Sequence, residues 1–379
     1  MTGSDVIQTA MNQAVRDGVF PGAVLAARVS GTIRCLTVAG RLSSDPASEP
    51  VQVSTIYDLA SLTKPLVTVT SLLLLIQTGQ LQLDVPIHSI LPDLEGAPIG
   101  LVSMRDLLTH SAGLPGWRPF YERLETKEIM PGRTEPAAIR DAVLHLIREE
   151  PLIYERGEKS LYSDLGFMLL GFMVERVGGS SLDRYFQEIV AKPLEAQPLL
   201  FTPMMAASHA ITPPVNRATI APTEWDNRRG RLLHGEVHDE NAAAMGGVAG
   251  HAGLFGTAEA VLAVSGAWLN AYLERSSTLD GALVREFTRR QSRVPESSWA
   301  LGWDTPTAPS SSGRYFSPEA FGHLGYTGTS LWIDPKRELE VVLLSNRVHL
   351  SRTNDTIRAF RPMIHDLVFQ ELVRSVGSS

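Results

Sequence analysis

The sequence contains very little cysteine and no excess of basic residues. Cys35 is the only cysteine among 379 residues, which excludes an intrachain disulfide. Because Cys35 lies in an apolar alternation, we expect it to pack as a small hydrophobic side chain. The formal net charge of -7 gives no basic footprint, so a nucleic acid partner is not expected.

Leader-type patterns and long apolar segments are also absent. No basic region followed by an apolar run opens the sequence, because Asp5, Gln8, Asn12 and Asp17 interrupt it. The longest apolar run, near Leu66, is too short and carries too many hydroxyl side chains to span a bilayer. We therefore expect a cytoplasmic protein without a membrane span. Its composition, 44% hydrophobic and 20% charged, is ordinary for a globular chain that forms one large domain or two lobes.

Several signatures of enzymes and metal sites are missing. There is no G-x-S-x-G elbow, G-x-G-x-x-G loop or G-K-[ST] phosphate loop, which argues against α/β-hydrolase, dinucleotide and P-loop proteins. The segment from His234 to His251 is rich in possible ligands, but Glu236 falls one place late for H-E-x-x-H. We expect no metal and no cofactor. The segment forms either a wall of a substrate cleft, with His251 near the reacting centre, or a structural loop.

The pattern of apolar residues predicts strands near both ends of the chain and helices between them. Two β-rich runs joined at Ser30-Gly31 indicate a hairpin, and Asp334 to Arg337 form the turn between two C-terminal strands. The predicted strands are 23–29, 32–38, 55–57, 322–333 and 340–345. The predicted helices are 4–17, one opened by Ser103-x-x-Asp106, 135–149 capped by Thr134, 164–177, 182–191, one from Thr257 to Leu273, and 355–374. Residues 202–256 form a long irregular region.

This order of elements predicts an α+β fold. Strands from the N- and C-terminal parts would form an antiparallel sheet flanked by the terminal helices, with a mainly helical lobe between them in sequence. We predict a single catalytic domain over 1–379. Its α/β lobe covers about 1–60 and 297–379, its helical lobe covers about 61–296, and the catalytic cleft lies between the two lobes.

The first motif that carries chemistry is Ser61-x-x-Lys64. If a helix begins at or just before Ser61, the hydroxyl and the amine lie side by side on one face. A lysine with a lowered pKa can activate a serine nucleophile, and the N–H groups of a helix N-terminus favour an oxyanion. The alternative is a capping serine followed by a solvated lysine. The apolar run from Leu66 to Ile76 indicates a buried helix, where a lysine needs a partner or a task.

Two further segments complete the candidate site. In Tyr162-Ser163-Asp164, the tyrosine can relay a proton if nearby cations lower its pKa. The alternative is a packed tyrosine with Asp164 as a helix cap. In the segment from Phe321 to Trp332, glycines at 322, 325 and 328 indicate close approach of another backbone or a ligand. The alternative there is an edge strand with a bulge.

Together the three motifs resemble those of the serine β-lactamase-like and penicillin-binding-protein family. The second motif, with its tyrosine, resembles that of the branch containing class C β-lactamases and family VIII carboxylesterases. The resemblance runs from about Gly22 to the C-terminus. It includes Leu107-Leu108-Thr109-His110-Ser111-Ala112-Gly113-Leu114, similar to L-L-T-H-T-S-G-L, and the segment from Gly253 to Ala258, similar to G-L-x-S-T-A.

The resemblance implies a β-lactamase/transpeptidase-like fold and roles for the motif residues. Ser61 would be the acylated nucleophile, Lys64 its proton acceptor, and Tyr162 a partner of Lys64 in proton transfer. The backbone N–H groups of Ser61 and Tyr326 would form the oxyanion hole. The remaining residues expected at the substrate are listed here: Asp164, His251, His323 and Gly325.

Two motif positions depart from the family pattern. Asp164 replaces the asparagine of Y-x-N; it accepts hydrogen bonds only, and it would hold Lys64 as an ammonium group. His323-Leu324-Gly325 replaces K-T-G, whose lysine and threonine help bind a substrate carboxylate in the family. Histidine is mostly neutral near pH 7 and leucine has no hydroxyl. These changes disfavour strong binding of penicillin-type carboxylates.

We therefore predict a serine hydrolase that forms an acyl-enzyme on Ser61 and acts on small ester, amide or D-amino-acid peptide substrates. The alternative within enzymes is a β-lactamase or a D-alanyl-D-alanine carboxypeptidase. The alternative from another class is a catalytically silent homologue that binds a cell-wall fragment or a protein. The sequence does not indicate an oligomeric state.

Overall fold

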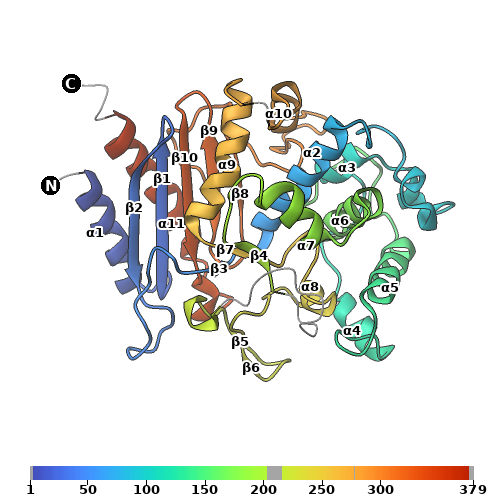
Figure 1. Ribbon diagram of the computed structural model, residues 1–379, viewed down its shortest axis with the longest axis horizontal. Coiled ribbons are helices and arrows are strands. Elements are labelled where there is room, and N and C mark those ends of the chain that lie inside the picture. The colour runs from blue at the N-terminus through green and yellow to red at the C-terminus, as the bar shows by residue number, and fades with distance from the viewer. Residues whose placement is uncertain (1–2, 203–215, 277, 375–379) are drawn as a thin grey trace.

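The computed structural model describes residues 3–202, 216–276 and 278–374. An antiparallel sheet near the chain termini adjoins a region made mainly of helices (Figure 1). The helices are listed here: α1 Gly3–Arg16, α2 Thr70–Gln77, α3 Met104–Leu108, α4 Phe120–Thr126, α5 Pro136–Glu149, α6 Asp164–Gly178, α7 Leu182–Tyr185, α8 Glu240–Ala244, α9 Ala258–Tyr272, α10 Gly281–Thr288 and α11 Ile357–Phe369. The strands are β1 Gly22–Val29, β2 Thr32–Gly40, β3 Tyr57–Asp58, β4 Leu199–Phe201, β5 Trp225–Asp226, β6 Arg231–Leu232, β7 Leu254–Gly256, β8 Phe321–Leu324, β9 Ser330–Asp334 and β10 Leu339–Ser345.

The main sheet joins strands from both ends of the chain in the order β2-β1-β10-β9-β8. All four pairings are antiparallel. Side chains of β1 alternate between two apolar clusters: Val24 and Ala26 pack in one, Ala23 and Leu25 in the other. This period of two places a core on each face of the sheet, and helices cover both cores.

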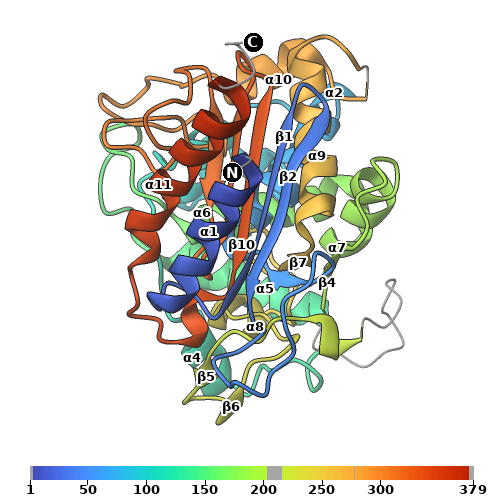
Figure 2. The ribbon, with the colours of Figure 1, turned by 90° about the vertical axis from the view of Figure 1, so that its left-hand side faces the viewer.

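The terminal helices α1 and α11 lie together over one face of the sheet (Figure 2). Cys35 is buried in the cluster beneath them, as expected, and burial raises the pKa of its thiol to about 11. Helix α9 packs on the opposite face against β1, β9 and β10. The predicted α+β class is confirmed. The predicted lobe boundaries stay a prediction. Helix α9 falls within the predicted helical lobe in sequence but packs on the sheet.

A continuous helical segment from Ala60 to Gln77 runs through the second core. It begins as a 3₁₀ turn at Ala60–Leu62, widens to π-helical turns at Lys64–Val69 and ends as α2. Among the described helices it is by itself long and apolar enough to cross a membrane, but 78% of its 18 residues are buried inside the protein. It is therefore the central core helix that the apolar run predicts.

Several local predictions are confirmed and three are wrong. The Ser103–Asp106 capping box and the Thr257 cap are present. The cap predicted at Thr134 is wrong, because Glu135 is the N-cap and Pro136 opens α5. The alternative role of Asp164 as a cap is wrong too, because Ser163 caps α6. The single strand predicted over 322–333 is two strands, β8 and β9, with a tight turn between them.

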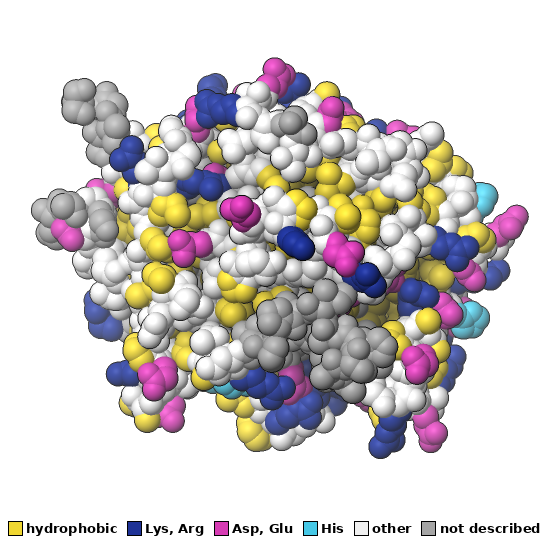
Figure 3. Space-filling view, in the orientation of Figure 1, with side chains coloured by type: hydrophobic (Ala, Val, Ile, Leu, Met, Phe, Trp, Pro, Cys, Tyr) yellow, Lys and Arg dark blue, Asp and Glu magenta, His cyan; other side chains and the backbone are white. Residues whose placement is uncertain are grey.

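Charged side chains of both signs are interspersed on the face shown in Figure 3. This face carries no continuous basic field among the residues that the structure describes. Its mixed charge agrees with the negative net charge of the sequence and gives no support for binding along a nucleic acid backbone.

Candidate active site

Ser61 lies in a short turn that is held in place by hydrogen bonds to the Asp58 carboxylate. Ala60, directly before it, has a φ of +48°, which a residue with a Cβ adopts only when its surroundings hold it. The Ala60 N–H donates to Asp58 Oδ1 at 2.8 Å, and the His238 N–H donates to Asp58 Oδ2 at 2.7 Å. The side chain of Asp58 is buried, and burial raises its pKa. Asp58 therefore joins the Ser61 turn to the loop before α8.

Lys64 is fully buried and surrounded by oxygen atoms. Its Nζ lies 3.1 Å from Ser61 Oγ, 3.0 Å from the backbone oxygen of His251 and 2.7 Å from Asp164 Oδ1. An ammonium group has three hydrogens to donate, and these three acceptors match them. The arrangement explains why a cation can lie inside an apolar helix bundle.

Two opposed effects act on the pKa of Lys64. Burial lowers it, because a charged form is costly away from water. The charge of Asp164 and the neighbouring Tyr162 raise it, and the net direction is upward. The effect of Asp164 that the sequence predicts is therefore present: the resting site holds an ammonium group beside Ser61.

Tyr162 is positioned by the start of α6 and by His110. Ser163 caps the helix by accepting from the Gly166 N–H at 3.3 Å, and its own N–H donates to His110 Nδ1 at 3.0 Å. The His110 ring lies 4.7 Å from the Tyr162 ring. Lys64 Nζ lies 4.8 Å from the centroid of the Tyr162 ring. Burial raises the pKa of Tyr162, and the Lys64 charge opposes that effect.

The third motif forms the opposite wall. Two hydrogen bonds join the turn between β8 and β9, residues 325–329, to the Ser61 turn. Thr327 Oγ1 donates to the backbone oxygen of Asp58 at 2.8 Å, and Thr329 Oγ1 donates to the backbone oxygen of Leu59 at 3.1 Å. A Cβ at Gly325 would come within 1.9 Å of Thr329 Oγ1. The close backbone approach predicted from this glycine is therefore real, and the turn places Tyr326 beside Ser61 in the cleft.

His323 is a neutral side chain of this wall. Burial and the Lys64 charge lower its pKa to about 3, and its Nδ1 lies 2.8 Å from the Leu324 oxygen. Because the Leu324 carbonyl oxygen can only accept a hydrogen bond, the neutral His323 ring carries its hydrogen on Nδ1. His323 therefore brings no positive charge to the cleft near neutral pH, as its residue type predicts.

The segment from His234 to His251 contributes a wall and no cluster of metal ligands. His251 is buried, its backbone oxygen accepts from Lys64, and its Nε2 lies 2.8 Å from Asp239 Oδ1. His234 pairs with the Ile220 oxygen and His238 with Glu224. Within 3–202, 216–276 and 278–374, no group of three or more potential ligands could hold a metal ion.

The predicted residues meet in one cleft that has two arms. The larger arm, about 680 Å³, is lined by Ser61, Tyr162, His323, Gly325 and Tyr326. The smaller arm, about 370 Å³, shares Ser61, Tyr162 and Tyr326 and adds Asp164 and His251. Lys64 lies behind both, against Ser61. The structure therefore brings all eight predicted site residues together.

Sequence reasoning missed a group of arginines in the larger arm. Arg347, Arg358 and Arg361 all line it. Arg347 and Arg361 are only 7% and 6% exposed, and their hydrogen bonds go to backbone oxygens, among them those of Tyr326 and Gly325. Burial and the neighbouring arginines lower the pKa of Arg361 to about 9. The three-residue spacing of 358 and 361 on a helix could have signalled a shared face.

The family model for Beta-lactamase matches residues 7–361 of the chain. The chain belongs to the beta-lactamase family. It is 32% identical over 330 residues to a putative D-alanyl-D-alanine carboxypeptidase of Salmonella agona, covering 80% of this chain and 72% of the relative. It is also 32% identical over 351 residues to the N-acetylmuramyl-L-alanine amidase of Bacillus subtilis, covering 87% and 78%.

A solved structure supports the fold independently. The penicillin-binding protein homologue from Pyrococcus abyssi superposes with a TM-score of 0.71 at 19% identity, over 98% of this chain and 77% of that one. The predicted family and the β-lactamase/transpeptidase-like fold are confirmed. The predicted enzyme class, a serine hydrolase of the β-lactamase and penicillin-binding-protein type, is confirmed with them.

Proposed function

We propose that the chain hydrolyses amide bonds through an acyl-enzyme on Ser61. The observation that carries this proposal is the position of Lys64 Nζ, 3.1 Å from Ser61 Oγ and 2.7 Å from Asp164 Oδ1. The Tyr162 ring centroid lies 4.8 Å from Lys64 Nζ, and Tyr162 lines both arms of the cleft together with Ser61. A nucleophile, a coupled pair of proton-transfer groups and a fixed backbone turn are what acyl transfer requires.

The proton moves through Tyr162 and Lys64 as one unit. In its reactive form this pair holds one proton fewer than its maximum. Ser61 Oγ attacks the carbonyl carbon and gives its proton to the pair, while the N–H groups of Ser61 and Tyr326 receive the oxyanion. The pair returns that proton to the leaving nitrogen, the C–N bond breaks, and water then attacks the ester by the same route in reverse.

The substrate bears a carboxylate that lies in the larger arm of the cleft. Arg347, Arg358 and Arg361 line that arm, and guanidinium groups pair well with carboxylates. They replace the positive charge that His323 does not supply. Two relatives have names of enzymes that act on alanine-containing substrates, a carboxypeptidase and an amidase, which favours an acylated amino acid or a short peptide.

Labelling and turnover test the proposal together. A fluorophosphonate probe should add mass at Ser61 in the wild type and none in Ser61→Ala. The wild type should hydrolyse alanine-containing peptide amides faster than p-nitrophenyl esters or nitrocefin, with Ser61→Ala as the blank. Dominant nitrocefin turnover would favour a β-lactamase, and an unlabelled wild type would favour a silent binding homologue.

The cytoplasmic location stays a prediction, which cell fractionation tests.

A further inference from the structure

A third cavity, of about 490 Å³, adjoins the smaller arm of the cleft and shares part of its lining. Tyr121, Glu240 and Arg352 line both the smaller arm and this cavity, which we call the outer chamber. Its other walls come from the β5–β6 hairpin and from the segment after β10. These residues are Glu224, Trp225, Asp226, Asn227, Arg228, Val348, His349, Leu350 and Ser351. A substrate held at Ser61 through the smaller arm can therefore extend into the outer chamber.

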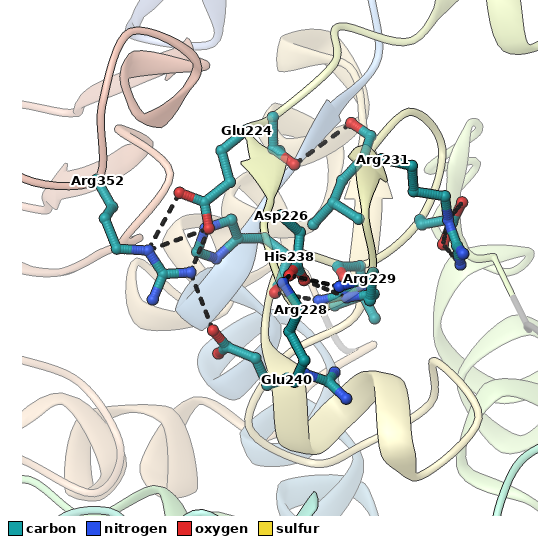
Figure 4. A network of polar contacts seen from close by, with 12 residues as sticks. Glu224, Asp226, Arg228, Arg229, Arg231, His238, Glu240 and Arg352 are labelled. Carbon is teal, nitrogen blue, oxygen red and sulfur yellow. Dashed lines mark hydrogen bonds and ion pairs between the residues drawn. The ribbon is translucent and has the colours of Figure 1, made fainter.

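The charged groups of the chamber already neutralise one another (Figure 4). Arg352 pairs with Glu224 and, at 2.9 Å, with Glu240. His238 Nε2 lies 3.0 Å from Glu224 Oε1. Burial raises the pKa of Glu224, but its hydrogen bonds and ion pairs with His238 and Arg352 outweigh burial and lower that pKa to about 2. This carboxylate therefore stays charged and paired near neutral pH.

The hairpin side of the chamber is fixed in the same way. Asp226 Oδ1 accepts from the N–H groups of Arg228 and Arg229 at 2.8 and 2.9 Å. The Asp226 carboxylate also pairs with the Arg229 side chain. Arg228 pairs with Glu125 and lies 4.6 Å from the centroid of the Tyr121 ring. The walls therefore offer many donors and acceptors in fixed positions.

The indole of Trp225 is an exposed aromatic surface in the lining of the outer chamber. The side chain of Trp225 is 62% exposed, although tryptophan is among the most hydrophobic residues by area. In the hairpin it stands opposite Leu232, which is 37% exposed and does not line the chamber. An exposed indole beside a cavity offers an electron-rich face to weakly positive C–H groups.

We propose that the outer chamber binds a neutral, hydroxyl-rich ring, a sugar unit attached to the acyl part of the substrate. The C–H face of a sugar ring stacks on Trp225, and its hydroxyls donate and accept simultaneously. That chemistry matches a lining in which donors and acceptors are both present and the charges are already paired. An anion or a cation would have to displace an existing ion pair. The sugar site rests on the proposed function for its place in the substrate.

Binding to an inactive protein tests the chamber separately from catalysis. The probe is an N-acetylglucosamine trimer, titrated by calorimetry into the Ser61→Ala protein. We expect saturable binding that is weakened at least tenfold when Trp225→Ala is added. Leu232→Ala is the matched control from the same hairpin and should bind as Ser61→Ala does. Melting temperatures of all variants show whether a loss of binding reflects a loss of fold.

The outcomes separate this inference from the proposed function. Sugar binding that depends on Trp225, in a protein whose wild type shows no amide turnover, supports the chamber and refutes the proposed reaction. Amide turnover without sugar binding supports the proposed reaction and refutes the sugar site in the outer chamber. Equal weakening by Trp225→Ala and Leu232→Ala would overturn the proposal, because the indole would then only stabilise the hairpin. Tighter binding of the cationic glucosamine trimer or of an anionic galacturonate trimer would overturn it too.

Discussion

Asp164 Oδ1 lies 2.7 Å from Lys64 Nζ, closer to that amine than Ser61 Oγ, which lies 3.1 Å away. The lysine is fully buried and the carboxylate is 17% exposed at the cleft. A family asparagine at this position would donate as well as accept but would carry no charge. The resting protonation state of Lys64 therefore depends on Asp164, and so does the pH at which the site becomes active.

Replacing Asp164 by asparagine should move activity to lower pH. Asp164 raises the pKa of Lys64 while burial lowers it, so removing the charge leaves burial dominant and the pKa falls. The rate rises with pH as the Tyr162–Lys64 pair loses a proton. Its rising limb should therefore shift downward by about one pH unit or more in Asp164→Asn. The measurement is kcat/KM of peptide amide hydrolysis against pH.

A surface variant controls for nonspecific charge effects in that experiment. Asp141→Asn removes the same charge from a side chain that is 73% exposed, and its profile should match the wild type. A rising limb in Asp164→Asn that stays in place, or moves to higher pH, would contradict the role given to this carboxylate.

Removing the Tyr162 hydroxyl should slow the chemical step with little change in binding. Tyr162 lies beside Lys64 and Ser61 in the cleft, and Tyr162→Phe keeps the ring that packs against His110 at 4.7 Å. We expect kcat to fall by about 10²–10⁴-fold, the usual contribution of a proton-transfer group. Steady-state kinetics give kcat and KM separately. Tyr272→Phe, on α9, is the control, and a kcat within a few-fold of wild type in Tyr162→Phe would refute the role.

The buried His323 should make the fold sensitive to acid. Its pKa is about 3 in the folded protein, below the usual value of about 6.5 in an unfolded chain. Stability is therefore full above pH 6.5 and is lost as pH falls from there toward 3. Between pH 7 and 5 this side chain should cost about 2 kcal/mol. Urea unfolding at both pH values should show a smaller loss for His323→Gln than for wild type, whereas His145→Gln, 57% exposed, should behave as wild type.

Local sequence patterns predicted the parts of the site that depend on one segment. The Ser61-Lys64 spacing, the buried helix behind it and the apolar alternation of β1 depend on neighbours in the chain. Such patterns also carried the hairpin and the helix caps at Ser103 and Thr257. They could place Tyr162 in the same cleft only through the resemblance to a family.

The features that sequence reasoning missed join distant segments. Asp58 holds the His238 N–H across 180 positions, and Arg361 binds the Gly325 oxygen across 36. No short pattern reports such contacts. The single strand predicted over 322–333 failed for a local reason: glycines at 325 and 328 indicate close backbone approach, but they also belong to the turn between β8 and β9 that carries Tyr326.

The arginines of the larger arm should select substrates with a free carboxylate. Arg358 is exposed and lines that arm, whereas Arg347 and Arg361 also hold the turn of Tyr326 through backbone oxygens, so Arg358 can be removed with less effect on the turn. In Arg358→Ala we expect KM for a peptide with a free C-terminal carboxylate to rise about tenfold, equivalent to about 1.4 kcal/mol of lost binding. The C-terminally amidated peptide should show no change. Arg34→Ala, exposed on β2, is the matched control, and an equal loss for both peptides in Arg358→Ala would show that no carboxylate lies in this arm.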